Sequence, residues 1–252
     1  MNSLFYWHNE LVNIWTHLAP GCIYIALLLE QFLVGSFNSW DDIMYIFMLT
    51  SVMYAYLSSA LFHCLVCHSE EFAIWSVRCD MVGIVAHLVG MCAYIIHSMW
   101  KCDPYRMKTA FARIALTFAI LTYVCTTKEF TNKRYKAIKP IPFIIFGLVL
   151  MYPMWVWAAD PTIIGATPGI KDTVIAWCTA SWGFLVLSVC FYVSRFPERW
   201  FPGQYDFLGS SHQIFHSLVV VSSSCALLAS YIVRQDEWCP IRNESFSQYL
   251  NA

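Results

Sequence analysis

Long apolar stretches alternate with short polar segments along most of the chain. Seven of these stretches come close to, or exceed, the roughly 20 residues that a helix needs to cross about 30 Å of hydrocarbon. The connections between them are short and leave no separate soluble domain. The pattern therefore predicts an all-α bundle of seven transmembrane helices over residues 14–233. The predicted spans are Ile14–Val34, Ile43–Cys67, Asp80–Trp100, Thr109–Thr126, Pro140–Ala159, Thr173–Val193 and His212–Val233.

The two ends of the chain differ from these stretches. In residues 1–13, aromatic side chains such as Phe5 and Trp7 are interleaved with polar ones such as Glu10. This mixture is typical of a helix that lies in the membrane interface, so we expect an interfacial helix before the first span. Residues 234–252 are expected to form a tail on the extracytoplasmic side.

Composition narrows the class of protein further. Hydrophobic residues make up 59% of the chain and charged residues 12%, whereas a soluble domain has about 25% charged residues. The net charge of −1 provides no basic field for nucleic acid. The composition therefore favours a multi-pass membrane protein and excludes a nucleic-acid-binding one.

Basic residues beside the spans mark the cytoplasmic side of a membrane protein. The segment between the fourth and fifth predicted spans holds Lys128, Lys133, Arg134, Lys136 and Lys139. This cluster favours a cytoplasmic amino terminus, although basic residues over the whole chain divide almost evenly between the two sides. The orientation is opposite to that of a G-protein-coupled receptor, so no G protein is expected. It places Cys102 and Cys239 on the same outer side, where a disulfide is an alternative to two free thiols.

Ionisable side chains inside membrane spans are costly, which makes each one a candidate functional residue. His63 lies near the end of the second predicted span, Asp80 at the start of the third, and His212 and His216 at the start of the seventh. The second span ends on the side where the third begins, and parity brings the start of the seventh there too. Three helices therefore present these four groups at one depth.

The spacing of the histidines suggests a metal site. His212 and His216 are four residues apart, so a helix directs both rings from one face. With His63 they would provide three ligands to Zn²⁺ and leave the fourth position open for water, as in catalytic zinc sites. Zinc lowers the pKa of such a water to about 7. Asp80 would hold or accept its proton, and Ser59 would orient a ligand or polarise a substrate carbonyl.

Two other interpretations of the polar residues stay open. Cys64 and Cys67 form a C-x-x-C pair beside His63, so a cysteine-containing metal site competes with the histidine site. Isolated histidines in membrane helices more often form hydrogen bonds between helices or contact lipid headgroups than bind metal. We expect that role for His17, His87 and His97.

Several motifs occur in a fixed order along the chain. They are His8–His17 (HNELVNIWTH), Ser59–His63 (SALFH), Cys67–Glu70 (CHSE), Asp80–Ile84 (DMVGI), Arg195–Gly203 (RFPERWFPG) followed by Asp206-Phe207, and Ser211–His216 (SHQIFH). They are spread along most of the chain, from His8 to His216. In them the chain resembles the progestin and adipoQ receptor family of haemolysin III-related zinc membrane proteins, which includes the adiponectin receptors.

The resemblance implies a role for each candidate residue. His63, His212 and His216 would bind zinc near the cytoplasmic face. Asp80 would contact the zinc-bound water, and Ser59 would lie beside the site. The resemblance also implies a cytoplasmic amino terminus. Family members are described as receptors for hormones or steroids, and some as hydrolases that act on ceramide.

Functions from two classes follow from these observations. The open three-histidine arrangement favours a zinc-dependent amidohydrolase that acts on a membrane lipid, a ceramide or another sphingolipid, with Asp80 and Ser59 as catalytic residues. The alternative is a receptor for a hormone or steroid ligand, or an endomembrane scaffold, in which the zinc is structural. The expected location is the plasma membrane or a Golgi-type internal membrane.

Overall fold

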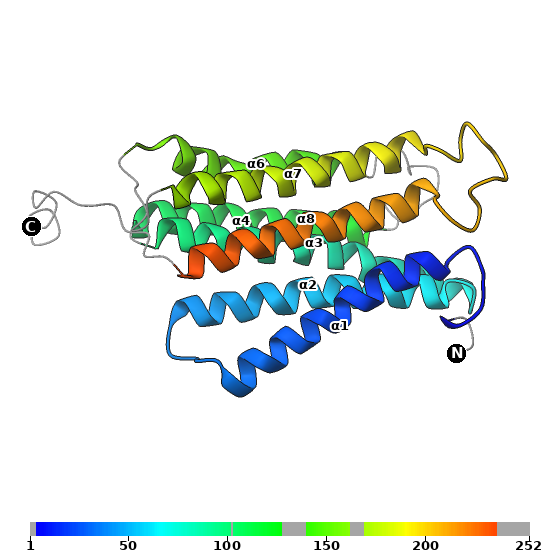
Figure 1. Cartoon of the computed structure of the whole chain (residues 1–252), viewed down its shortest axis with the longest axis horizontal. Helices are drawn as coiled ribbons and strands as arrows, with labels where there is room; N and C mark the ends of the chain where they lie inside the picture. Colours follow the sequence, from blue (N-terminus) through cyan, green and yellow to red (C-terminus); the bar gives the residue numbers. More distant parts are fainter. Residues whose placement is uncertain (1–3, 102, 128–139, 162–168, 236–252) are drawn as a thin grey trace, which may run out of the picture.

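Seven helices lie roughly along the long axis of the molecule in a computed structural model that describes residues 4–101, 103–127, 140–161 and 169–235 (Figure 1). Each is long and apolar enough to cross a membrane. The predicted all-α fold with seven candidate spans is confirmed for this part of the chain. The helices are α1 (Leu11–Val34), α2 (Trp40–Leu65), α3 (Glu70–Trp100), α4 (Pro104–Thr126), α6 (Pro140–Ala159), α7 (Ile170–Ser194) and α8 (Ser211–Gln235).

Several predictions fall on residues outside the described part. The basic segment at 128–139, both members of the Cys102–Cys239 pair, and all of the predicted tail beyond Gln235 belong to this group. The orientation and the disulfide therefore stay predictions.

The predicted interfacial helix before the first span is wrong for residues 5–10, which form bends, irregular structure and a turn, and α1 begins at Leu11. Local side-chain hydrogen bonds explain the difference. The ring Nδ1 of His8 accepts from the backbone N–H of Glu10 at 3.2 Å, and the indole of Trp15 donates to the carbonyl of Leu4 at 3.0 Å. Bonds of this kind compete with the backbone bonds of a helix.

The third helix starts at Glu70 rather than at the predicted Asp80. The hydroxyl of Ser69 caps it by accepting from the backbone N–H of Phe72 at 3.2 Å. Glu70 and Glu71 occupy the first turn, where negative charge is favourable. Asp80 therefore lies inside a long helix, still at the end of the bundle where α2 ends.

Small residues bring α2 and α3 close together. A Cβ atom at Gly90 would lie 2.5 Å from the Cβ of Ser51, and one at Gly83 would lie 2.6 Å from the Oγ of Ser58. Close backbone approach at small residues is a common way for membrane helices to associate. This contact fixes α2 and α3 against each other beside His63.

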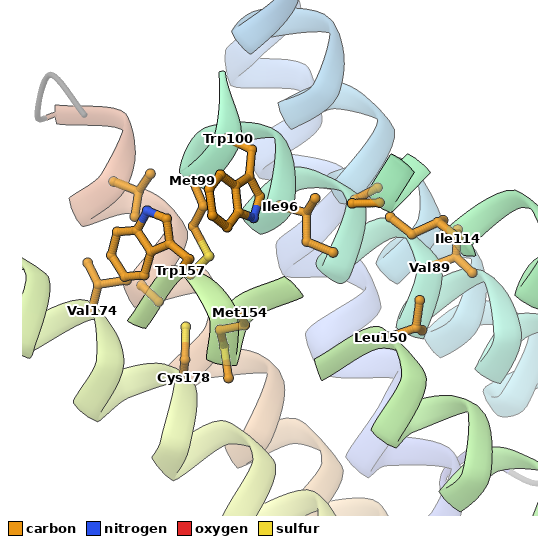
Figure 2. Packing of buried hydrophobic residues seen from close by; sticks show 14 of the residues in the cluster. Val89, Ile96, Met99, Trp100, Ile114, Leu150, Met154, Trp157, Val174 and Cys178 are labelled. Carbon is orange, nitrogen blue, oxygen red and sulfur yellow. The ribbon is translucent and has the colours of Figure 1, made fainter. Parts of the chain in front are cut away.

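The bulkiest apolar packing lies at the end of the bundle away from the amino terminus. Figure 2 shows Met99 and Trp100 of α3 near Trp157 of α6 and Val174 of α7, all within one buried cluster. Trp157 is fully buried. The helices are thus held firmly together at this end.

An ion pair ties α8 to α2 at this same end. Arg234 donates to the Asp42 carboxylate at 2.9 Å, and its guanidinium lies 4.4 Å from the ring centre of Tyr45. Gln31 of α1 accepts longer bonds from Arg234, at 3.3 and 3.4 Å. Three helices are therefore joined here by polar contacts.

Candidate metal site and its cavity

The three histidines predicted to bind metal lie together at the end of the bundle that holds the amino terminus. His63 comes from α2, and His212 and His216 come from the first turns of α8. One ring nitrogen from each lies within 4.8 Å of the other two. His63 and His216 are buried, and His212 is partly exposed.

The spacing of this group fits a tetrahedral metal ion. The Nε2 atoms of His63 and His212 are 3.3 Å apart. Two nitrogens that bind one tetrahedral zinc at about 2.0–2.1 Å lie roughly 3.3–3.4 Å from each other. The group could therefore hold a metal ion with little movement of this pair.

Cysteines take no part in this group. Cys64, Cys67 and Cys79 form no disulfide within the described part of the chain, and none of them belongs to the candidate metal group found there. The geometry favours the three-histidine site over the cysteine-containing alternative.

Glu10, which was not among the predicted site residues, lies directly behind His63. Its Oε2 atom is 2.7 Å from Nδ1 of His63 and also accepts a bond of 2.7 Å from the Asn13 amide. Burial raises the pKa of this carboxyl, but the hydrogen bonds with His63 and Asn13 outweigh burial and lower the pKa to about 2. The Glu10 anion favours a proton on Nδ1 of His63, which leaves the Nε2 lone pair directed toward His212.

The first helix also forms a wall of the site beside His216. The rings of His17 and His216 are stacked, with centres 3.8 Å apart and planes 8° apart. Thr16 Oγ1 lies 3.4 Å from Nδ1 of His216. The HNELVNIWTH motif contains Glu10, Thr16 and His17, so the sequence did indicate that these residues matter. The motif alone does not say which histidine each residue contacts.

The three histidines expected to bond between helices have different outcomes. His87 Nε2 lies 2.8 Å from Ser223 Oγ on α8, and His97 Nε2 lies 2.7 Å from Asp41 on α2, so this prediction is confirmed for both. The prediction is wrong for His17, whose ring nitrogens are buried with no hydrogen-bond partner in the described part of the chain. Its stacking on His216 uses the ring face instead.

Asp80 and Ser59 lie beside the histidines without joining the metal group. Both are buried, and both line the same cavity as His63. Asp80 interacts with the Ser59 hydroxyl and lies within electrostatic range of His63. The structure thus brings all five predicted site residues to one place, with the three histidines as the group suited to metal.

Two polar side chains that were not among the predicted site residues fix the position of the start of α8. The Glu198 carboxylate accepts from the backbone N–H of Ser211 at 2.8 Å and from the Ser211 hydroxyl. Burial raises the pKa of Glu198, but these hydrogen bonds lower it below its ordinary value. Gln213 donates to the carbonyl oxygens of Asn9 and Phe207 at 3.4 and 3.1 Å. These bonds fix the helical turn that carries His212.

A cavity of about 1540 Å³ extends from the histidines into the bundle. Every described helix except α4 contributes to its walls. Polar groups gather at the histidine end, while Leu88, Met91, Ile95 and Met151 line it farther inside. Cavities for drug-sized ligands are about 300–1,000 Å³, so this one has room for a lipid.

The fold and the site define a membrane protein with seven candidate spans and a buried three-histidine group that could hold a metal. Residues 5–227 match the model of the Haemolysin-III related family. The chain therefore belongs to this family, which confirms the resemblance to the progestin and adipoQ receptors.

Relatives with similar sequences come from fungi, plants and animals. The ADIPOR-like receptor IZH2 of Saccharomyces cerevisiae is 31% identical over 91% of this chain and 74% of its own length. The heptahelical transmembrane protein ADIPOR1 of Oryza sativa is 26% identical over 94% of this chain and 78% of its own. Membrane progestin receptor alpha of Sus scrofa is 27% identical over 90% of this chain and 65% of its own.

Proposed function

We propose that this chain is a zinc-dependent hydrolase that cleaves the amide bond of a membrane lipid, a ceramide or another sphingolipid. The observation that carries the proposal is the joining of a buried three-histidine group to a large, mainly apolar cavity. An acyl chain can occupy the apolar part while its amide lies at the histidines. Asp80 lines the same cavity and supplies a carboxylate for proton transfer.

Each site residue has a separate task in this proposal. His63, His212 and His216 hold the zinc as neutral ligands, which lessens the cost of burying them. When bound, zinc supplies a Lewis acid that activates water at neutral pH. Asp80 accepts a proton from the attacking water and returns it to the leaving amine, so that amide and water become fatty acid and amine. Ser59 orients Asp80 or the substrate carbonyl.

Lipid hydrolysis by purified protein tests this assignment. The metal-loaded protein in lipid nanodiscs is given ceramide with a labelled acyl chain, and released fatty acid is measured by mass spectrometry. Asp80→Asn should lower the rate by at least about 100-fold, the size of a general acid–base contribution, while retaining the metal. Asp172→Asn is the matched control, because Asp172 is an exposed carboxylate at the start of α7. Folded, metal-loaded wild-type protein that releases no fatty acid from ceramides would contradict the proposal.

We further propose that the amino terminus is cytoplasmic, so that the site faces the cytoplasm of a plasma or Golgi-type membrane. The basic residues at 128–139 support this orientation. Cys67 offers a test, because it is an exposed free thiol at the same end of the bundle as the histidines. An impermeant maleimide should label it only after cells are permeabilised, with Cys67→Ser as the control. Labelling of Cys67 in intact cells would contradict the proposal and indicate the opposite orientation.

A receptor role is the second candidate, because relatives carry the names ADIPOR-like receptor and membrane progestin receptor. In that case the ligand would be a hormone or steroid, and zinc would stabilise the bundle. A receptor with Asp80→Asn should keep ligand binding and signalling, whereas a hydrolase should lose turnover. His212→Ala tests a scaffold role. This variant should reduce partner binding or protein level only if the metal supports that role.

A further inference from the structure

The polar layer at the metal site recurs two helical turns deeper in the bundle. On α2, Tyr56 is seven residues before His63. On α3, His87 is seven residues after Asp80, and on α8, Ser223 is seven residues after His216. Seven residues are nearly two turns of a helix and about 10.5 Å along it, so each position returns to the same face. Three helices therefore direct a second set of polar side chains into the bundle at one depth.

Contacts join these three side chains into one cluster. His87 Nε2 lies 2.8 Å from Ser223 Oγ. The rings of Tyr56 and His87 meet edge to face with centres 5.7 Å apart, and the Tyr56 hydroxyl interacts with Ser223. All three residues line the same cavity as the metal-site histidines.

Hydrogen-bonding capacity in this cluster is incomplete. Tyr56 is 1% exposed, and its hydroxyl lacks a hydrogen-bond partner of normal geometry within the described residues. His17, whose ring centre is 5.1 Å from that of Tyr56, is likewise buried with both nitrogens unpaired in that part of the chain. Buried polar groups are normally paired, and leaving one unpaired is costly. Both residues line the cavity, so an oxygen inside it can supply the missing partner.

The walls around the cluster are apolar. Met91, Cys92 and Ile95 of α3 and Ala226 of α8 line the cavity beyond it. A few polar groups in an otherwise apolar pocket fix the orientation of a ligand and select for the groups that match them. The Tyr56 hydroxyl can donate to or accept from an oxygen. The Ser223 hydroxyl donates to the Val219 carbonyl at 2.9 Å and can accept from a ligand hydroxyl through its oxygen.

We propose that Tyr56, His87 and Ser223 form a second polar subsite that binds a hydroxyl or carbonyl oxygen of a lipid ligand. That oxygen would lie about 10 Å along the ligand from the group held at the three histidines. The ligand is thus an elongated lipid with an apolar body and a second oxygen, either a hydroxylated acyl chain or a steroid with oxygens at both ends. This proposal rests on the proposed function, because it uses the same cavity, and it specifies the kind of lipid that the cavity binds.

Binding of compounds that contain no amide tests the subsite without any need for turnover. Metal-loaded protein in nanodiscs is titrated calorimetrically with two pairs of ligands. One pair is a fatty acid with and without a mid-chain hydroxyl, and the other is a steroid with oxygens at both ends or at one end. The wild-type protein should prefer the doubly oxygenated member of at least one pair by about fivefold or more, as one hydrogen bond provides. The pair that shows the preference identifies the source of the lipid.

Variants then assign the preference to the cluster. Tyr56→Phe and Ser223→Ala should abolish it while changing affinity for the plain ligand less than about twofold. Tyr24→Phe and Ser230→Ala are matched controls, because these residues are buried on α1 and α8 but do not line the cavity. Metal content shows that each variant is folded. Equal affinity of the wild-type protein within both pairs, or a preference that survives both cluster variants, would overturn the proposal. Loss of hydrolysis alone would leave it standing.

Discussion

Replacing Glu10 with glutamine removes a negative charge from behind the proposed zinc site with almost no change in side-chain size. The carboxylate lies 2.7 Å from Nδ1 of His63. Glu10 directly precedes α1, whereas His63 belongs to α2. Glutamine keeps one carbonyl oxygen as an acceptor but cannot favour the proton on Nδ1 as strongly. The ring of His63 should then donate its Nε2 lone pair to a metal less effectively.

The magnitude can be worked from this contact in two ways. A hydrogen bond to a charged group contributes about 1.5–3 kcal/mol, and about 1.4 kcal/mol is tenfold in affinity. Loss of a hydrogen-bonding partner of a metal-binding histidine costs roughly 10–100-fold in metal affinity. The two ranges agree. Because the Glu10 side chain is 26% exposed, solvent screens part of the effect, and we expect Glu10→Gln to weaken zinc binding nearer to tenfold.

Competition between the purified protein and a chromogenic zinc chelator measures this change directly. Glu30→Gln is the matched control, since Glu30 is an exposed carboxylate on α1, near the end of that helix farther from Glu10. Glu10→Ala, which removes the acceptor as well as the charge, should bind zinc more weakly than Glu10→Gln. The reasoning is refuted if Glu10→Gln binds zinc as tightly as the wild-type protein, or if Glu30→Gln loses as much affinity.

Three further predictions concern stability. The Glu10 pKa is lowered from 4.5 to about 2, so the stability difference between wild type and Glu10→Gln, measured by urea unfolding of the metal-free proteins, should hold from pH 7 to 5. It should disappear only as the pH falls from 4.5 toward 2. Gly90→Ala places a Cβ 2.5 Å from a Ser51 carbon and should lower the free energy of unfolding by about 1–3 kcal/mol, seen as a lower thermal midpoint, whereas Gly183→Ala meets nothing within 4 Å and should not. Arg234→Gln leaves Asp42, 6% exposed, without its ion pair and should destabilise the bundle by on the order of 3 kcal/mol in thermal melts, without changing zinc affinity.

Most of the correct predictions about the site follow from hydropathy and from the periodicity of the helix. Spans and their parity depend on hydropathy along short stretches, and they were enough to bring His63, His212 and His216 to one depth. The i, i+4 spacing of the two α8 histidines is likewise a local property. The first turns of α3 were missed because Glu70 and Glu71 lowered the hydropathy there, although Ser69 and these two glutamates form a helix start that the sequence displays.

These local rules could not predict contacts between segments that are distant in the sequence. Glu10 meets His63 across 53 residues, and the meeting depends on how α1 is rotated against α2. The irregular structure of residues 5–10 depends on bonds such as that from the Trp15 indole to the Leu4 carbonyl, which hydropathy does not predict. The second polar layer is an intermediate case, because its seven-residue spacing is visible in the sequence once Asp80 and His216 are known to share a depth.

The contacts that stabilise the bundle and the residues of the candidate site lie mainly at opposite ends of it. Tryptophans and an ion pair between α2 and α8 stabilise the end farther from the amino terminus. The histidines lie at the other end, from which the cavity extends into the bundle. A cavity forfeits the packing contacts that stabilise a core, so firm packing elsewhere allows the histidine end to stay hollow. Polar bonds rather than apolar packing then position its side chains, as Glu10 does for His63 and Glu198 for the start of α8. Substitutions at the tryptophan end should therefore change unfolding free energy more than metal affinity, and substitutions of these polar residues should do the reverse.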